Sequence, residues 1–341
     1  MVSKITFKKV VCMALLLVLV AYAVIAVLPV GNNFEGKNPM MKEGDMPVLI
    51  AHGGGNMEFP DNTLEAFYNA YSVDDRVMME TDVNITRDGV VILSHDTRID
   101  RKTNKSGAIE DWTYEDLISE RVDFGYTNET EDEKRISDEL IKFKNPDGKE
   151  VTPLDVEYPD GVLPRDSEVF LATTLEELIV AFPNNKINVE IKQPGDVGKK
   201  AFLASLELCK KYEAFDRVIF ASFHNEIYNL FREYQKKDLV PDNFMYSPGI
   251  IGVAKFYLSS LFGMDIFFND GIVVLQLPTD DYYIQLATEF VVERAHDHNI
   301  AIQYWTINDR EEMKRLIEMG VDGITTDYPH RLKEVYNEYS K

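Results

Sequence analysis

Short apolar runs alternate with amphipathic segments along most of this chain. The apolar runs have the length of buried β-strands and lie at residues 48–52, 77–83, 186–191, 217–222, 243–247, 272–277, 301–305 and 322–326. Between most of them, apolar residues recur with helical spacing, at residues 63–72, 174–182, 198–213, 224–236, 281–298 and 309–319. Eight strand–helix repeats predict an α/β fold, a parallel TIM-type (β/α)8 barrel.

The alternation is interrupted after the second predicted strand. A run at 90–94 follows the Asp88-Gly89 turn, so we expect it to fold back as an extra hairpin strand. Residues 97–172 then form an insertion, and its part 126–168 is rich in charged residues. We expect a small lobe over the barrel mouth, because long structureless loops are uncommon in compact domains. A flexible surface loop is the alternative. The barrel with its insertion is expected to span residues 47–335.

A different pattern precedes the barrel. Residues 10–30 form an uncharged apolar run, long enough as a helix to span a bilayer. The lysines of segment 1–9 precede it, which predicts a cytoplasmic N-terminus and an extracellular catalytic domain on a single-pass membrane protein. Residues 31–46 are polar and are expected to form a tether. The alternative is a signal peptide cleaved near Ala21-Tyr22-Ala23, which would make the protein secreted.

Composition narrows the class of protein. The 45% hydrophobic content supports a sizeable core, and the net charge of −22 disfavours nucleic acid as a partner. The two cysteines, Cys12 and Cys209, lie in unrelated segments, so no disulfide is expected. Export without disulfides favours a bacterial cell surface.

Candidate chemistry begins at the predicted barrel mouth. Glu80 and Asp82 are two residues apart on one strand, so both side chains point to the same face. Together with Glu190 they form a carboxylate set without cysteine, which suits one hard divalent ion, Ca²⁺ or Mg²⁺. Salt bridges to basic residues inside the barrel are the alternative. His52 and His95 flank this set and are candidates for general acid and base, although each could be a buried structural histidine.

Three further residues are candidates for substrate binding. Lys192 follows Glu190 at the spacing that places both in the mouth, where it would contact phosphate or pair with the carboxylates. Trp305 would form a wall of the pocket or belong to the core. Gly53, within Gly53–Gly55, would let backbone N–H groups approach a phosphate, or would form a tight turn.

These residues stand in a series of short motifs. The chain reads IAHGGG at 50–55, PDNT at 60–63, ETDV at 80–83, SHD at 94–96, VEIK at 189–192, WTIN at 305–308 and DGITTDYP at 322–329. The series resembles that of the glycerophosphodiester phosphodiesterase family, in family order from about Val48 to Pro329. Two positions depart from the family pattern. Gly53 stands where the family has an arginine that contacts phosphate, and Asp61 replaces a glutamate.

The resemblance implies a metal-dependent hydrolase that converts a glycerophosphodiester to sn-glycerol 3-phosphate and an alcohol. It implies that Glu80, Asp82 and Glu190 hold the metal, while His52 and His95 exchange protons in roles that stay open. A lysophospholipase D or a hydrolase of polyglycerol-phosphate polymers is the alternative within this chemistry. A non-catalytic phosphodiester-binding module is the alternative from another class.

Overall fold

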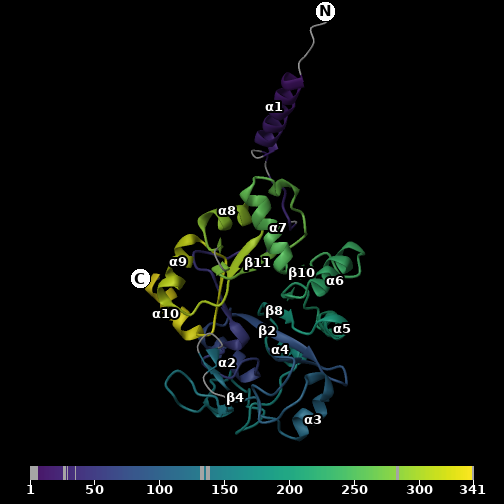
Figure 1. Cartoon of the computed structure of the whole chain (residues 1–341). Coiled ribbons are helices and arrows are strands. Elements are labelled where there is room, and N and C mark those ends of the chain that lie inside the picture. The colour runs from purple at the N-terminus through teal and green to yellow at the C-terminus, as the bar shows by residue number, and fades with distance from the viewer. Residues whose placement is uncertain are drawn as a thin grey trace, which may run out of the picture.

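The computed structural model describes residues 7–25, 28, 30–34, 36–130, 134–135, 139–281 and 284–339. Its central sheet has the strand order β10-β9-β8-β2-β1-β15-β14-β11, and every neighbouring pair in this order is parallel. The bounds of these strands are β1 (Val48–Ala51), β2 (Met78–Ile85), β8 (Ile187–Ile191), β9 (Val218–Ala221), β10 (Met245–Tyr246), β11 (Val274–Leu277), β14 (Ala301–Tyr304) and β15 (Gly323–Thr326). Among the described residues, one backbone hydrogen bond, from Val273 N–H to the Tyr246 carbonyl at 3.4 Å, crosses the seam between β10 and β11. The result is a nearly closed barrel, which confirms the predicted α/β barrel (Figure 1).

Helices follow most strands and cover the outside of the barrel. They are α2 (Leu64–Val73), α4 (Leu175–Ala181), α5 (Gly195–Lys211), α6 (Asn225–Lys236), α7 (Ile250–Leu261), α8 (Glu289–Asp297), α9 (Arg310–Met319) and α10 (Pro329–Tyr339). Local sequence explains several starts, because the side chains of Thr63, Thr174 and Asp309 each accept a backbone N–H of the first turn. The extra strand β3 (Val91–Leu93) pairs antiparallel with β2, as the Asp88-Gly89 turn predicts.

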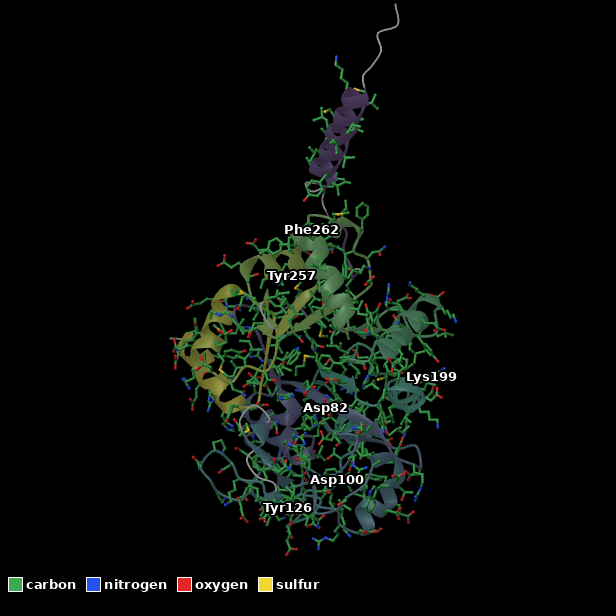
Figure 2. The ribbon with its side chains drawn as sticks, viewed as in Figure 1. Asp82, Asp100, Tyr126, Lys199, Tyr257 and Phe262 are labelled. Atoms are coloured by element: carbon green, nitrogen blue, oxygen red, sulfur yellow. The ribbon has the colours of Figure 1, made fainter. Side chains whose placement is uncertain are left out.

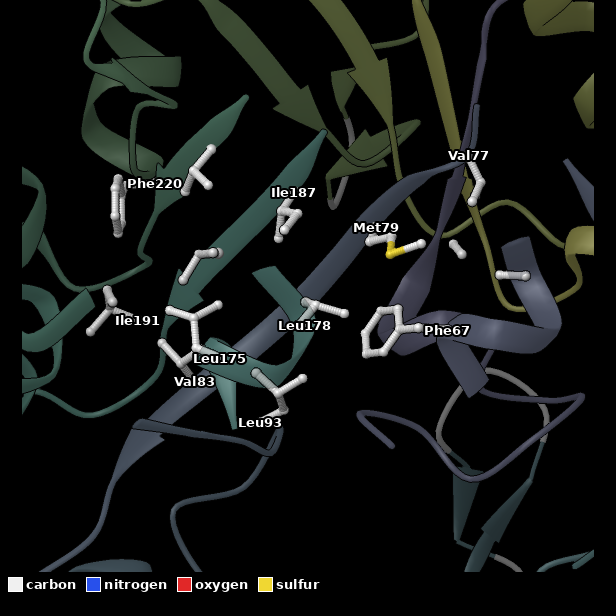
Figure 3. Packing of buried hydrophobic residues seen from close by; sticks show 14 of the residues in the cluster. Phe67, Val77, Met79, Val83, Leu93, Leu175, Leu178, Ile187, Ile191 and Phe220 are labelled. Atoms are coloured by element: carbon white, nitrogen blue, oxygen red, sulfur yellow. The ribbon is translucent and has the colours of Figure 1, made fainter. Parts of the chain in front are cut away.

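Two layers of apolar side chains hold the barrel together. The larger lies between the strands and the outer helices, where Phe67, Met79 and Leu178 pack near one another (Figure 3). The smaller fills the inside of the barrel at the N-terminal ends of the strands, with Ile50 and Met78 fully or almost fully buried. The inside is therefore closed at one end, and the polar side chains gather at the other.

The predicted helix at 281–298 is wrong in its first half. Asp280–Asp281 (β12) and Ile284–Gln285 (β13) pair as a small hairpin, and α8 begins only at Glu289, after the N-cap residue Thr288. The apolar segment that forms α7 was not predicted as a helix. Its apolar residues lie on more than one face, so the helical spacing is not visible in the sequence.

The N-terminal region differs in part from the prediction. The apolar run forms α1 (Phe7–Ile25), and residues 1–6 of the predicted cytoplasmic segment lie outside the described residues. In the part of the chain that the structure describes, no helix is both long and apolar enough to cross a membrane. The prediction of a transmembrane helix at 10–30 is therefore not confirmed.

Segment 31–46 is not a free tether over its described residues. Asn38 is 2% exposed and donates hydrogen bonds to the carbonyls of Val273 and Asn299 at 2.7 and 2.8 Å. Met40 is 1% exposed and belongs to the apolar cluster inside the barrel. The segment thus closes the barrel at the N-terminal ends of its strands, which its polar composition did not reveal.

The insertion at 97–172 contains little regular structure. Its elements are α3 (Tyr114–Ser119), the pair β4 (Tyr126–Thr127) and β7 (Ile141–Lys142), and the pair β5 (Glu129–Thr130) and β6 (Lys134–Arg135). Residues 145–155 border a cavity shared with α10, to the side of the barrel mouth. No described residue of 126–168 lines the cavity at the mouth, and a lobe over the mouth stays a prediction.

Candidate active site

The alternation of side chains along β2 places an acidic cluster at the mouth. Met78, Glu80 and Asp82 share the inward face, with Met78 in the closed end and Asp82 nearest the opening. In the register between β2 and β8, Asp82 lies directly beside Glu190. One carboxylate oxygen from each of Glu80, Asp82 and Glu190 lies within 4.8 Å of the other two. The structure thus brings together the three residues predicted to bind metal.

Two neighbouring groups hold these carboxylates in place. The Gly53 N–H donates to Glu80 Oε2 at 2.9 Å, and the Asn62 amide donates to Asp82 Oδ2 at 3.0 Å. Asn62 also accepts hydrogen bonds from the Thr81 hydroxyl and the Asp82 N–H. Asn62 therefore positions a candidate ligand, a role that was not predicted for it from the sequence.

His52 is held by a carboxylate that follows the neighbouring strand, β15. Its Nδ1 lies 2.7 Å from Asp327 Oδ1, and its Nε2 lies 4.0 Å from Glu80 Oε2. The other oxygen of Asp327 accepts a hydrogen bond from the Asn308 amide at 2.6 Å. Burial opposes protonation of His52, but the charges of Asp327, Glu80 and Asp82 raise its pKa well above 6.5. With Nδ1 bound to Asp327, Nε2 is the nitrogen free to exchange a proton.

His95, which follows β3, has a similar arrangement on the same side of the mouth. Its Nδ1 lies 3.0 Å from Asp96 Oδ1 and 3.3 Å from a guanidinium nitrogen of Arg101. Arg101 also donates two hydrogen bonds to Asp96, at 2.6 and 2.8 Å. Burial opposes ionisation of Asp96, but His95 and Arg101 hold its pKa well below the usual range. Asp96 is therefore an anion that orients the His95 ring.

A lysine lies beside the carboxylates, and their surroundings shift the three carboxyl pKa values in different directions. Lys192 Nζ lies 3.2 Å from both Asp82 and Glu190. Burial would raise the pKa of Asp82, but Lys192 and the two histidines hold it below its usual value. Burial and the neighbouring Asp82 raise the pKa of Glu80 to about 8, and burial also raises that of Glu190. Glu80 therefore becomes fully ionised at neutral pH only when a further cation joins the cluster.

The donor set fits a hard divalent cation. Three carboxylates, two of them buried and Glu190 half-buried, match the preferences of Ca²⁺ and Mg²⁺ in the absence of a sulfur ligand. Asn188, 4% exposed and next to Glu80 in the register, adds a buried amide oxygen that has no hydrogen-bond partner. An oxygen of this kind is suited to a cation or to a water bound to one.

The cluster opens into a cavity of about 470 Å³. One wall is polar and carries both histidines and the carboxylates, whereas the other is largely apolar and is formed by Ala221, Phe223, Pro248, Pro278 and Trp305. The rings of Phe223 and Trp305 meet edge to face at 5.8 Å between centroids. Trp305 thus lines the cavity, and its contact with substrate stays a prediction.

Comparison with known proteins shows to which family the chain belongs. The sequence pattern of the Glycerophosphoryl diester phosphodiesterase family matches residues 52–331. The chain belongs to this family. Its members are phosphoric diester hydrolases, so the chain is an enzyme and not a non-catalytic binding module.

Relatives cover nearly the whole barrel. A glycerophosphodiester phosphodiesterase of Bacillus altitudinis is 26% identical over 86% of this chain and 99% of its own length. A lysophospholipase D of Homo sapiens is 26% identical over 85% of this chain and 86% of its own. A phosphodiesterase of Oleispira antarctica, solved with the product sn-glycerol-3-phosphate, shares the fold with a TM-score of 0.58 at 18% identity, covering 86% of this chain and 97% of its own.

The departure from the family pattern at Gly53 has a local counterpart. Gly53 has φ +52°, and a Cβ built there would lie 2.9 Å from the Cβ of Asp61. Asp61 itself pairs with Lys102, whose Nζ lies 2.8 Å from Oδ1. A longer side chain at residue 53 would point toward Asp61. Lys102 thus places a cation beside that direction.

Gly53 does not line the cavity in the way one prediction required. Its N–H is bound to Glu80, and the N–H of Gly55 donates to the His52 carbonyl at 2.8 Å. The Gly53–Gly55 segment is therefore a tight turn that orients Glu80 and His52. No role was predicted for Arg101, Asn308 or Asp327. Asn308 and Asp327 nevertheless lie in the motifs WTIN and DGITTDYP, which resemble those of the glycerophosphodiester phosphodiesterase family.

Proposed function

We propose that the protein hydrolyses glycerophosphodiesters to sn-glycerol 3-phosphate and an alcohol. The observation that supports this most strongly is the cluster of Glu80, Asp82 and Glu190 between two histidines whose Nδ1 atoms are each bound to an aspartate. Such an arrangement combines an anion-rich metal site with a proton donor and a proton acceptor. The names of the relatives support the substrate class.

In the proposed mechanism the two imidazoles transfer protons to and from the oxygens at the scissile phosphate. One Nε2 removes a proton from the nucleophile, a water or the neighbouring glycerol hydroxyl. The other donates a proton to the oxygen of the leaving alcohol. Lys192 contributes positive charge near the phosphate, and Trp305 packs against the glycerol or the head group. A divalent cation held by the three carboxylates would stabilise negative charge on a non-bridging phosphate oxygen.

The test is release of glycerol 3-phosphate by the full-length protein from glycerophosphocholine, glycerophosphoethanolamine, glycerophosphoglycerol and glycerophosphoinositol. Each substrate is assayed with Ca²⁺, Mg²⁺ or EDTA. We expect metal-dependent release that His52→Ala, His95→Ala and Glu80→Ala each abolish, whereas the exposed-site control Glu207→Ala keeps it. Release that continues in EDTA, or in all three variants, would contradict the proposal.

The apolar wall supports a second candidate, a lysophospholipase D. Phe223 is 47% exposed and stands at the cavity rim against Trp305, where an acyl chain would find apolar contact. Phe223→Ala should then raise KM for a lysophospholipid more than KM for glycerophosphocholine. Phe290→Ala, on the exposed face of α8, is the matched control. Equal effects on both substrates would favour the small diester, and polyglycerol phosphate is included as the polymeric substrate.

We also propose that the barrel lies outside the cell, next to the membrane. The support comes from the sequence, in which Lys4, Lys8 and Lys9 precede the uncharged run at 10–30. In a bacterial host that expresses the full chain, protease added to intact cells should remove the barrel. A barrel that is degraded only after lysis would contradict this placement.

A further inference from the structure

An apolar surface lies at the closed end of the barrel, opposite the mouth. Its exposed side chains come from the end of α7 and the turn that follows, and we call these residues the basal patch: Leu258, Leu261, Phe262, Met264 and Phe267, each 45–62% exposed. Asp265 is the single charged residue between Leu258 and Phe268. It is 1% exposed and binds Arg294 and His298, so it contributes no charge to the surface. A group of large exposed apolar side chains of this kind marks an interaction site.

The course of α7 separates the basal patch from the catalytic residues. Pro248, two residues before α7, lines the cavity at the mouth. The helix then runs for 12 residues, or about 18 Å, toward the N-terminal ends of the strands. In Figure 2, Tyr257 and Phe262 lie on the side of the molecule toward α1, and Asp82 lies farther from that helix.

Helix α1 meets the basal patch directly. The Tyr22 hydroxyl donates a hydrogen bond to the Phe262 carbonyl at 2.7 Å. Figure 1 shows α1 extending away from the end of the barrel at which α7 and α8 lie. The four consecutive residues Leu15, Leu16, Leu17 and Val18, which make up a full turn, are each 59–65% exposed. The helix is therefore apolar on all sides.

The shape of this apolar surface identifies its occupant. A groove on a protein partner receives one apolar face of a helix and leaves the other face polar. A helix that is apolar all round, with an exposed apolar patch at its base, fits the interior of a lipid layer instead. The net charge of −22 makes an electroneutral lipid surface the better match than an anionic one.

We propose that the closed end of the barrel docks on a lipid bilayer through α1 and the basal patch, so that the active-site mouth faces away from the membrane. If the proposed function also holds, this orientation favours substrates that reach the mouth from the aqueous side, such as soluble diesters or polymer chains. Lipids of the same bilayer would have to leave it to react.

Tryptophan quenching tests the orientation. The chain has two tryptophans, Trp112 in the insertion and Trp305 at the mouth, and both lie away from the basal patch. The full-length protein and its Phe267→Trp variant are bound to phosphatidylcholine vesicles with plain or brominated acyl chains. We expect brominated chains to leave the native emission unchanged and to reduce the additional emission of Phe267→Trp. Quenching of the native emission, or no quenching in the variant, would overturn the proposal.

A second measurement tests the patch itself. Leu261→Ser with Phe262→Ser and Phe267→Ser should weaken sedimentation with phosphatidylcholine vesicles severalfold, because these exposed side chains contribute lipid contact but little folding energy. The matched control is the triple change Leu154→Ser, Leu163→Ser and Leu239→Ser, three exposed leucines elsewhere. Unchanged sedimentation, or a wild-type dimer in solution that the patch variant dissociates, would overturn the proposal. Neither measurement depends on turnover, so failure of the proposed function would show separately in the hydrolysis assay.

Discussion

The imidazole of His52 and the carboxylate of Asp327 lie side by side at the barrel mouth, with 2.7 Å between Nδ1 and Oδ1. His52 follows β1 and Asp327 follows β15, and these neighbouring parallel strands are paired in register, Ala51 with Thr326. The pair therefore depends on the closure of the barrel between its first and last strands. Asp327 fixes which imidazole nitrogen is presented to the cavity.

Asp327→Asn should reduce kcat by about 10²–10⁴-fold, the range that general acid–base catalysis supplies. The amide still reaches Nδ1 but no longer offers a negative charge. Because Asp327 helps to raise the pKa of His52, the limb of the pH–rate profile that His52 controls should move to lower pH. Steady-state kinetics between pH 5 and 10 measure both effects.

The control for this variant is Asp309→Asn. Asp309 caps α9 on the surface, and asparagine caps a helix equally well. We expect its kcat and pH profile to match the wild type. An Asp327→Asn enzyme with reduced kcat but an unshifted profile would mean that Asp327 only maintains structure.

Metal binding should depend on pH because Glu80 must lose its proton. Burial and Asp82 raise the pKa of Glu80 to about 8, so the metal-free site holds a proton below that pH. The affinity for Ca²⁺ or Mg²⁺ should therefore weaken by about tenfold for each pH unit below 8. Calorimetric titrations at pH 6, 7, 8 and 9 in buffers of different ionisation enthalpy would count the released proton. Glu80→Gln should bind weakly without this pH dependence, and binding that is constant from pH 6 to 9 in the wild type would refute the prediction.

The same shift predicts how pH affects the stability of the metal-free protein. The pKa of Glu80 is higher in the folded state than in the unfolded chain, so the folded state retains the proton. The contribution to stability is complete below about pH 4.5 and is lost as pH rises to about 8. Urea unfolding in EDTA should therefore show a smaller contribution from Glu80 at pH 8 than at pH 5. The difference in pH dependence between wild type and Glu80→Gln separates the contribution of Glu80 to the free energy of unfolding from the contributions of the other carboxyls.

Gly53→Ala should destabilise the protein although it adds only one methyl group. The backbone at Gly53 has φ +52°, and the new Cβ would lie 2.9 Å from that of Asp61. The left-handed conformation alone costs about 1–2 kcal/mol for a residue with a Cβ. Gly89→Ala is the matched control, because Gly89 also has positive φ but no atom within 4 Å of an added Cβ. Equal losses in the free energy of unfolding would show that contact with Asp61 adds nothing.

The barrel could be predicted from the sequence because its strands are short, apolar and regularly spaced. Hydrophobic periodicity reports burial of a segment, and eight buried strands separated by helices leave few alternative folds. Hydrophobic periodicity fails to detect a segment whose buried side chains are polar. Asn38 is buried through hydrogen bonds to two backbone carbonyls, so the segment around it had the composition of a linker.

The carboxylate cluster of the candidate site could be predicted from the sequence, but most of the side chains that hold it in place could not. Glu80 and Asp82 are two apart on a strand, and this spacing alone places them on one face. The aspartate partners of the two histidines lie at very different distances along the sequence. Asp96 is adjacent to His95, whereas Asp327 is 275 residues from His52 and meets it only after the barrel closes. Asn62 was hidden by its neighbour, because Thr63 gives the helix-cap signal.

Arg165 illustrates such a long-range support outside the site. This insertion residue donates hydrogen bonds to the carbonyls of Leu171 and Ala172 and pairs with Glu65, which is 2% exposed, at 3.3 Å. Arg165→Met should lower the free energy of unfolding by about 3–5 kcal/mol, because it leaves the buried Glu65 carboxylate without its cation. Urea unfolding at pH 7 measures the loss.

The pH dependence of that loss separates charge from packing. Burial already raises the pKa of Glu65, and Arg165 opposes the rise, so the pKa should rise further in Arg165→Met. A protonated Glu65 needs no cation, and the penalty should therefore shrink as pH falls toward 5. Adding Glu65→Gln should recover part of the stability at pH 7. Arg98→Met, which removes an exposed pair with Asp100, should cost less than about 1 kcal/mol. A loss in Arg165→Met that is the same at pH 5 and pH 7 would assign the effect to packing and the backbone hydrogen bonds alone.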